Sequence, residues 1–406
     1  MPDGRPKEGR SSWYGNLFCF APWARRGVGM KIHEFIARRL ILLIPVIVGV
    51  SIFTFAIAQI IPADPAAALC GEKCIGDAYE QNVKRLGLDK PVSEQYTIYV
   101  QNLMQGDWGE SVAYKRPVID IVKDAAPITL EMAFLSLLIG YSLGISLGIL
   151  SAVWQDRVFD HLSRLVAITF VSLPIFWLAM MLQYAFATQK GICDPLTDWL
   201  PLVTPTDGGC LPLYGRHDTS YSYPQEGFMW PLPETGTGFH LVDSWFVGNA
   251  ALEELPEEFS SRRSLFKDTL THLALPCITL GVASAGSLLR YMRASLLEVL
   301  REDYVRTARA KGVSEFRTVI VHACRNALVP IVTILGFSIG GAIGGAVLTE
   351  SIFAFNGMGR VAVKAIQYLD FATIMGVTLI TSVIFLLSNL VVDITYALID
   401  PRVRLE

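Results

Sequence analysis

Few side chains in this sequence are placed to do chemistry, and their surroundings argue against catalysis. Residues 144–148 (GISLG) match the GxSxG pattern of serine hydrolases. That pattern needs a sharp turn between a strand and a helix, whereas Ser146 stands in a long apolar run that predicts a continuous helix. A hydrolase would also need a histidine beside Ser146 inside the membrane, and no histidine stands midway along a predicted span. We interpret the match as accidental and expect no catalytic residue.

Two carboxylates, Glu131 and Asp393, are the only charged side chains inside the predicted membrane spans. Buried ionisable groups can hold the coupling ion of a carrier, so an ion-coupled carrier stays open as an alternative. Both residues stand near span ends, however, and the end of the span follows Asp393 within a few residues. Their positions favour helix contacts over a proton relay.

Motifs for nucleotides and metals are absent from the sequence. It contains no GxxxxGK[ST] phosphate-binding loop and no HExxH or CxxC metal pattern. We therefore expect no cofactor-binding residue and no metal site. Any energy that drives this protein must come from elsewhere.

The composition predicts a membrane protein. Of the 406 residues, 52% are hydrophobic and only 17% are charged, against about 25% charged in soluble domains. A disordered scaffold is excluded by this composition. The net charge of -3 gives no overall basic field for nucleic acid, so nucleic acid is excluded as a partner.

Six apolar stretches are long enough to cross a bilayer, whose hydrocarbon core of about 30 Å needs roughly 20 helical residues. The fold class is therefore all-α, with six transmembrane helices. The predicted spans are residues 40–61, 128–153, 165–187, 270–289, 326–349 and 374–397.

Basic residues in the flanks of the spans predict a cytoplasmic N-terminus and C-terminus. The cytoplasmic segments are then 1–39, 154–164, 290–325 and 398–406, with a net charge of +9, while the extracytoplasmic segments carry -10. The first span is too long for a cleaved signal peptide and reads as an uncleaved anchor. The residues from Met30 onward (MKIHEFIARRL) would suffice as the N-terminal flank of the first span, so we expect Met30 to be the natural start.

Two extracytoplasmic segments are too long to be simple turns. Residues 62–127 contain the helix-like stretches 78–86 and 93–104 and predict a small folded cap. Residues 188–269 contain eight prolines and twelve acidic residues against five basic ones. This second segment predicts a long, irregular and acidic insertion in a core of residues 128–397, and it is expected to contact a partner or partly cover the cavity.

Four cysteines fall in the extracytoplasmic segments, where an oxidising environment permits disulfides. The pairs Cys70 with Cys74 and Cys193 with Cys210 are plausible. Other pairings of these four, and free thiols, remain open because sequence alone does not fix connectivity.

Glycines recur every fourth residue in two of the predicted spans. At that spacing they line one helix face and let a second helix approach closely. The pattern predicts tight helix packing, with gating between two halves of a bundle as the functional alternative. The glycines are Gly140, Gly144, Gly148, Gly336, Gly340 and Gly344.

The longest cytoplasmic loop between spans, residues 290–325, has eight basic and four acidic residues. Residues 304–310 read as a short helix, and Gly312 can supply the left-handed turn that ends it. Small residues on one side of this helix would let it enter a groove on another protein. A basic loop without any partner is the alternative.

Residues 304–312 (YVRTARAKG), with His322 and residues 325–327 (RNA), resemble the EAA loop of bacterial ABC importer permeases of the dipeptide, oligopeptide and nickel subfamily. Further matches to this subfamily run in order along the chain: residues 38–40, 60–65, 86–91 (LGLDKP), 106–109 (GDWG), 350–353 (ESIF), 357–360 (GMGR), 389–393 (NLVVD) and 400–402 (DPR). The chain departs from the family pattern in four respects. Residues 306–308 are RTA where the general EAA pattern has Glu-Ala-Ala, and the later Leu-Pro of that pattern is replaced. Asn356 stands where the subfamily often has proline, and the insertion at residues 188–269 is longer than expected for the family.

The resemblance implies a type I ABC importer permease in the bacterial inner membrane, which forms half of the pathway for a peptide or related small solute. It implies three kinds of partner besides the lipid bilayer: a second homologous permease subunit, two ABC ATPase subunits that hydrolyse the ATP, and an extracytoplasmic binding protein. The coupling residues would be Tyr304, Arg306, Thr307, Ala308, Ala310 and Gly312. Dipeptides, oligopeptides, peptide antibiotics, nickel and modified sugars all remain possible solutes.

Overall fold

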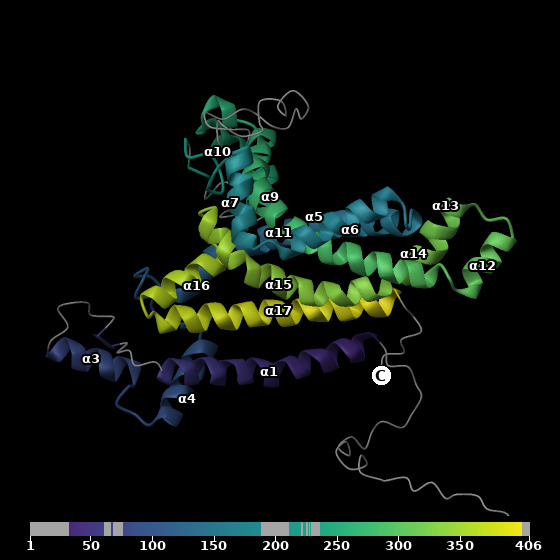
Figure 1. Cartoon of the computed structure of the whole chain (residues 1–406). Helices are drawn as coiled ribbons and strands as arrows, with labels where there is room; N and C mark the ends of the chain where they lie inside the picture. The colour runs from purple at the N-terminus through teal and green to yellow at the C-terminus, as the bar shows by residue number, and fades with distance from the viewer. Residues whose placement is uncertain are drawn as a thin grey trace, which may run out of the picture.

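The fold is a bundle of long helices from which a smaller, partly helical unit projects (Figure 1). It is seen in a computed structural model that describes residues 32–60, 66–67, 76–187, 211–220, 222–224, 226, 228 and 236–399. Within these ranges extended chains pair only as two isolated bridges, so the all-helical prediction is confirmed. Cys70, Cys74, Cys193 and Cys210 lie outside the described residues, as does Met30.

Five described helices are long and apolar enough to cross a membrane, and a sixth crossing exists if one bent pair counts as a span. Their apolar content requires burial in lipid or protein, and their backbone groups are satisfied within each helix. The five are α1 (Ile32–Ile60), α5 (Val118–Val153), α11 (Arg262–Val299), α15 (Val329–Ile352) and α17 (Phe371–Ile399).

The predicted third span, residues 165–187, is not one helix. It is α6 (Val158–Ser172) followed by α7 (Ile175–Phe186), and the two axes are bent by 108°. Pro174 precedes α7, and Leu173 before it has an extended backbone with φ -77° and ψ 132°. A residue before proline disfavours the helical region, so the apolar run is broken at this point.

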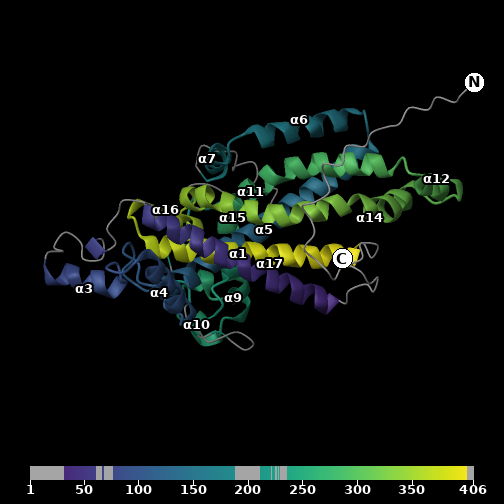
Figure 2. The same ribbon diagram turned by 90° about the horizontal axis from the view of Figure 1, so that it is seen from below.

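The long helices lie roughly parallel, with α5 and α11 packed along most of their lengths. Helix α15 packs on this pair and on α17, and α1 contacts α17. Viewed from below, α1 and α6 lie on opposite sides of the bundle (Figure 2). The short helix α12 (Asp303–Ala310) marks one end of the bundle, and α16 (Met358–Gln367) marks the other.

Two short helices follow α1, and the second of them lies against it. They are α3 (Asp77–Leu86) and α4 (Val92–Met104), close to the stretches predicted for the cap. The Ser51 hydroxyl lies 2.8 Å from the Tyr96 hydroxyl, and Phe55 packs against the rings of Tyr96 and Tyr99. These contacts fix α4 across the α16 end of α1.

Part of the insertion between α7 and α11 lies in the described residues, and this part includes short helices. Its described part contains α9 (His240–Phe246), α10 (Asn249–Glu253) and the 3-10 turn Glu257–Phe259. A small apolar cluster stabilises it, made of Tyr223, Phe228, Val247, Leu252 and Leu265. Leu265 belongs to α11, so this unit is built directly onto a bundle helix.

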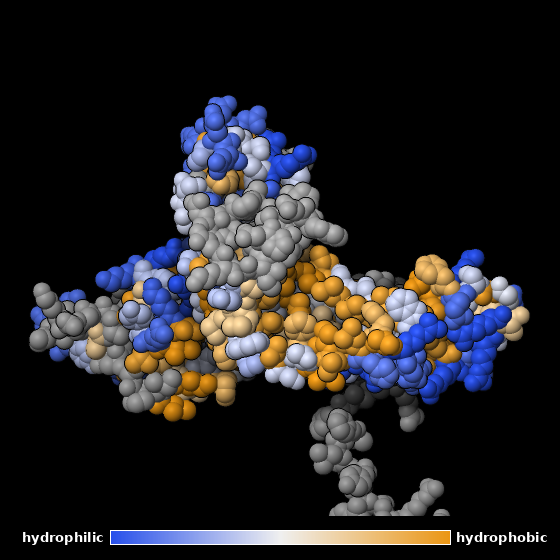
Figure 3. Space-filling model, turned by 45° about the horizontal axis from the view of Figure 1, so that its top comes forward, coloured by the Kyte–Doolittle hydropathy of each residue, from blue (hydrophilic) through white to orange (hydrophobic). Residues whose placement is uncertain are grey.

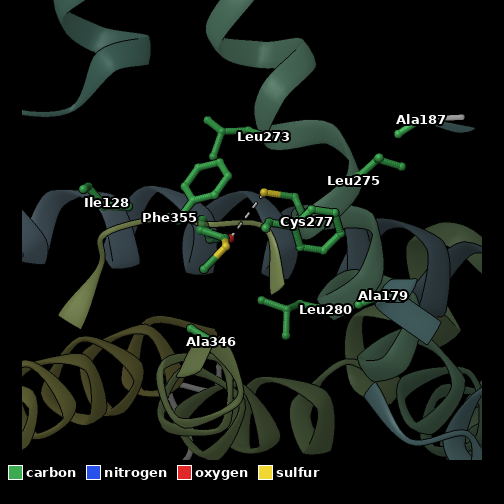
Figure 4. Packing of buried hydrophobic residues seen from close by; sticks show 11 residues of the cluster. Ile128, Ala179, Ala187, Leu273, Leu275, Cys277, Leu280, Ala346 and Phe355 are labelled. Carbon is green, nitrogen blue, oxygen red and sulfur yellow. Dashed lines mark hydrogen bonds between the residues drawn. The ribbon is translucent and has the colours of Figure 1, made fainter. Parts of the chain in front are cut away.

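A larger cluster lies where the projecting unit meets the bundle (Figure 4). There the buried side chains of Leu273 and Cys277 from α11 pack with Phe355, which follows α15. The Cys277 thiol donates to the carbonyl of Met132, at 3.6 Å. Side chains from α5, α7, α11 and the turn after α15 therefore share one core.

Glycines let α5 and α11 approach one another closely. A Cβ atom at Gly140, Gly144 or Gly148 would lie 2.9 Å from a carbonyl oxygen of α11. Likewise, a Cβ atom at Gly281 of α11 would lie 2.9 Å from the Ser136 carbonyl oxygen of α5. Side chains larger than hydrogen would force the two backbones apart.

The glycines of α15 have other surroundings. A Cβ atom at Gly336 would lie 2.7 Å from Asn389 Oδ1, and one at Gly340 would lie 2.5 Å from the Phe385 ring, both on α17. Gly344 has nothing within 4 Å of this position. Five of the six predicted glycines therefore lie at close helix contacts, and one faces open space. A gating role for the glycines of α5 or of α15 stays a prediction.

We predict that Gly144→Ala lowers the stability of the subunit by about 1–3 kcal/mol, because overpacking must shift Ala285 and Leu288. The matched control is Gly344→Ala, which adds the same methyl group to a helix where space is open. Thermal unfolding of both variants in detergent measures the difference. Equal midpoints for the two variants would contradict the close contact.

Candidate functional site

The predicted coupling helix is α12, at one end of the bundle. It spans Asp303–Ala310 and follows α11 after a turn of three residues. Glu302 before it has an extended backbone, and Asp303 places an acidic side chain in the first turn, where the helix dipole favours it. The helix observed at residues 303–310 agrees with the stretch predicted at residues 304–310.

Gly312 ends this helix in a Schellman motif. Its φ of +77° lies in the left-handed region, which costs glycine little. The amide of Gly312 donates to the carbonyl of Arg309 at 2.9 Å, and the amide of Val313 donates to that of Ala308 at 3.2 Å. A Cβ atom at Gly312 would meet nothing within 4 Å, so the backbone conformation alone requires glycine here.

A single side chain of α12, that of Val305, is fully buried. It lies in a cluster with Leu296 of α11, Val319 and Ala323 of the π-helix Thr318–Ala323, and Ala327 of α14 (Cys324–Ala327). The helix is therefore attached to the bundle by one apolar side chain while its other faces stay open. Figure 3 shows hydrophilic side chains gathered at this end of the molecule.

The other predicted coupling residues lie on the open part of α12 or beside it. The Tyr304 hydroxyl accepts from Asn326 Nδ2 at 2.7 Å, and Arg306 pairs with Asp303 at 3.2 Å. The Thr307 hydroxyl donates to the Asp303 carbonyl at 2.8 Å. Ala308 is half-buried and Ala310 is exposed. The small residues thus leave the surface of α12 flat and accessible.

Arg309 and Glu315 close the turn after α12. The guanidinium donates two hydrogen bonds to the carboxylate, at 3.0 and 2.6 Å. These bonds lower the pKa of Glu315, so the pair contributes stability above the usual glutamate pKa and loses it as the pH falls. Both side chains are exposed, and such pairs contribute less than about 1 kcal/mol. The sequence analysis did not identify this pair.

A buried ion pair joins α6 to α11 near the same end. Asp160 accepts from Nε and Nη2 of Arg293 at 2.7 and 2.8 Å and is fully buried. The Ser151 hydroxyl and the Asp156 amide also donate to this carboxylate, at 2.6 and 3.0 Å. Arg293 precedes α12 by ten residues, so this pair anchors the part of α11 that carries the coupling helix. Sequence analysis missed it because the partners are 133 residues apart.

Both carboxylates inside the predicted spans are paired with arginines. Asp393 of α17 lies 3.2 Å from Arg39 of α1. Glu131 of α5 lies 2.7 Å from Arg216 of the insertion and also accepts from the Leu241 amide at 2.7 Å. These pairs join helices and hold the insertion on the bundle, in agreement with the expected helix contact of Asp393.

A third buried carboxylate, Glu350, lies just beyond the predicted end of its span and inside the observed α15. It accepts from the Thr129 hydroxyl of α5 at 2.6 Å and from the Arg360 amide at 2.9 Å. A Cβ atom at Gly357 would lie 2.3 Å from the Glu350 carboxylate, and one at Gly359 would lie 2.6 Å from the Val347 backbone. Residues 350–353 and 357–360, two of the stretches that match the subfamily pattern, thus form one tight turn.

No group of three or more histidine, cysteine or acidic side chains in the described ranges could hold a metal ion. Ser146 is exposed in the middle of α5, away from any turn between a strand and a helix. What the described arrangement offers instead is an exposed helix, α12, carried on a rigidly packed helix pair.

Comparison with known families gives two adjacent matches. Residues 144–405 match the binding-protein-dependent transport system inner membrane component, and residues 32–133 match the N-terminal part of such membrane components. Together the matches include the long helices except for residues 134–143 of α5.

Curated relatives resemble the chain over most of its length. The probable D,D-dipeptide transport system permease protein DdpB of Escherichia coli is 40% identical, over 89% of this chain and 94% of the relative. The di/tripeptide transport system permease protein DppB of Pseudomonas aeruginosa is 38% identical, over 91% and 98%. The glutathione transport system permease protein GsiC of E. coli is 33% identical, over 91% and 99%.

We predict that Arg293→Met lowers the stability by about 3–5 kcal/mol, because it removes two short hydrogen bonds from the buried Asp160 carboxylate and leaves only the longer contact with Arg164 Nε, at 3.4 Å. The double variant Asp160→Asn/Arg293→Met removes both charges and is expected to recover part of this loss. Thermal midpoints in detergent give the comparison. The role of the pair would be disproved if the single variant unfolded at the wild-type midpoint.

Proposed function

The chain belongs to the family of inner membrane components of binding-protein-dependent transport systems, and we propose that it forms half of the translocation pathway of an ATP-driven importer of short peptides. It is a multi-pass inner membrane protein and a permease subunit, not an enzyme. The named solutes of the three relatives are D,D-dipeptides, di- and tripeptides and glutathione, all of them short peptides. This common chemistry supports a peptide as the solute.

The observation that carries the proposal is the geometry of α12. One buried side chain, Val305, attaches α12 to the bundle. Gly312, which has no side chain, ends the helix, and nothing lies within 4 Å of its Cβ position. A helix presented in this way can enter a groove of an ATPase subunit, with Thr307, Ala308 and Ala310 allowing a close approach. Tyr304 and Arg306 would border that contact.

The partners and the orientation follow from the same proposal. The α12 end would face the cytoplasm, as the excess of basic residues in 290–325 favours, with both termini on that side. There two ATPase subunits would bind, one to this chain and one to a second, homologous permease subunit. The α16 end and the insertion would then face the extracytoplasmic binding protein.

Transport would couple ATP binding to two arrangements of the helix bundle. Closure of the ATPase subunits on ATP would move α12, and α11 would move with it because Val305 and Leu296 share one apolar cluster. A ligand shifts such an equilibrium only by its differential affinity for the two states. In this proposal Gly336 and Gly340 keep α15 close to α17, and α5 and α11 move against these two helices as the other half of the bundle.

We predict that Gly312→Asp abolishes solute uptake and solute-stimulated ATP hydrolysis, while the subunit still inserts and assembles. The substitution strains the left-handed backbone by only about 1–2 kcal/mol, and nothing lies within 4 Å to clash. Its main effect would be a charge at the ATPase contact. Uptake and ATPase assays in proteoliposomes measure both activities.

The matched control for this variant is Gly106→Asp. Gly106 follows α4, has φ +85° and also has nothing within 4 Å of its Cβ position, so the added strain and charge are the same. We expect near-normal uptake from this control. Normal uptake by Gly312→Asp, or equal losses in both variants, would refute the coupling role of α12.

We also predict that uptake depends on ATP and not on a proton gradient. In whole cells, ATP depletion should stop uptake, whereas collapse of the proton gradient at constant ATP should not. The variant Asp393→Asn, which breaks the pair with Arg39, should keep this energy dependence. Uptake that ceased with the gradient would favour the ion-coupled carrier instead.

A further inference from the structure

Helix α7 runs across the bundle direction instead of along it. It rises away from α6 beside α9 in Figure 1, and in Figure 2 it is seen nearly end-on. The bend of 108° directs α7 nearly perpendicular to α6 and slightly back toward the start of α6. If α6 runs along the membrane normal, as the neighbouring long helices do, α7 lies close to the membrane plane.

The length of α6 places this bend near one membrane surface. Its 15 residues extend roughly 22 Å at about 1.5 Å per residue, less than the hydrocarbon core of about 30 Å. A helix that starts at the hydrocarbon boundary on the α12 side therefore ends in the opposite leaflet, about 8 Å short of its hydrocarbon boundary. Helix α7 begins there, within the depth of about 5–10 Å to which interfacial helices insert their apolar face.

The inner face of α7 is occupied by the protein. Leu178 and Ala179 are buried, and the helix packs against α11 and α15. Ala179 is part of the cluster of Figure 4. Gln183 is the one amide side chain of α7, and it also turns inward, where its Nε2 donates to the Leu213 carbonyl at 3.0 Å.

The outer face of α7 is apolar, and its polar groups are the Tyr184 hydroxyl and the indole N–H of Trp177. Its five side chains follow the spacing of one helix face, and each is between 41% and 58% exposed. Aromatic and sulfur-containing residues alone make it up: Phe176, Trp177, Met180, Met181 and Tyr184. This is the reverse of a helix in water, which would turn Gln183 outward and these five inward.

Charge and continuity favour lipid as the occupant of this face. Residues 165–187 contain no acidic residue, lysine or arginine. The exposed side chains of α6, among them Leu165, Ile168 and Val171, continue the apolar surface up to the bend. A contiguous exposed apolar surface of this size is unfavourable in water, and no charged group on it would orient a polar partner.

We propose that α7 is an interfacial helix that lies in the headgroup region of the leaflet opposite α12, with its aromatic and methionine face in lipid. Trp177 and Tyr184 then occupy the membrane–water boundary, where their amphipathic rings are favoured. Helices of this kind insert their apolar face by about 5–10 Å. The insertion, which accepts the hydrogen bond from Gln183 through Leu213, is thereby held next to the membrane surface.

Photocrosslinking tests this placement in the full chain, co-expressed with its neighbouring subunits in native membranes. The photoreactive residue p-benzoylphenylalanine replaces Trp177 or Met181, one variant at a time, and mass spectrometry identifies what becomes attached. We expect a mass shift of one phospholipid as the main product at both positions. Attachment should fall in the half of the acyl chain nearest the headgroup.

Two control positions use the same residue. Leu178 is on the opposite face of α7 and is 6% exposed, and Phe316 is 76% exposed at the α12 end. Neither should give a phospholipid adduct. Should the Leu178 variant fail to insert, the Phe316 variant alone serves as the control.

Each alternative occupant gives a distinct product. Crosslinks from Trp177 and Met181 to another polypeptide would make the face a protein interface, and the absence of any adduct would place it in water. Attachment near the methyl end of the acyl chain would place α7 deep in the core, as part of a broken span. Each of these results overturns the interfacial placement.

Discussion

The structure depends on how closely α5 and α11 approach each other. Carbonyl oxygens of α11 lie 2.9 Å from where Cβ atoms of Gly140, Gly144 and Gly148 would stand, so the two backbones are in direct contact for three turns. Helix α6 joins the pair in the same way, since a Cβ atom at Gly286 would lie 2.7 Å from the Ala167 carbonyl oxygen. Such contacts leave no room for independent sliding, so these helices act as one rigid body. This body carries α12 at one end and the insertion at the other.

Charged side chains with hydrogen-bond or ion-pair partners secure the same arrangement without doing chemistry. Glu131, Asp160 and Asp393 each have an arginine partner, and Glu350 is satisfied by a hydroxyl and backbone amides. Every one of these contacts joins separate helices or a helix to the insertion. Charged groups in a membrane are expensive unless they are paired in this way. Their partners explain why a chain with several carboxylates near the membrane needs none of them to carry an ion.

Local sequence signals predicted the parts of this fold that depend on neighbouring residues. A helix at residues 304–310 that ends at Gly312 followed from the helix-forming residues and one glycine, and the structure has this helix at Asp303–Ala310 with Gly312 at its end. The bend at Pro174 was missed because hydropathy runs unbroken through residues 165–187, although the proline itself was a visible signal. The pair Asp160–Arg293 and the turn around Glu350 could not be found in this way. Their partners are distant in sequence, and only the packed helices bring them together.

The rigid body explains how a small helix at one end can affect the other end of the permease. Val305 attaches α12 to Leu296, and Arg293 attaches the same part of α11 to α6. A displacement of α12 must therefore move α5, α6 and α11 together, because bending any one of them would break the glycine contacts or expose Asp160. Helix α7 lies at the far end of this body, at the bend that follows α6. Under the proposed coupling role of α12, a body embedded at that end in lipid headgroups would tilt about this region, and the tilt would convert movement at α12 into separation from α15 and α17.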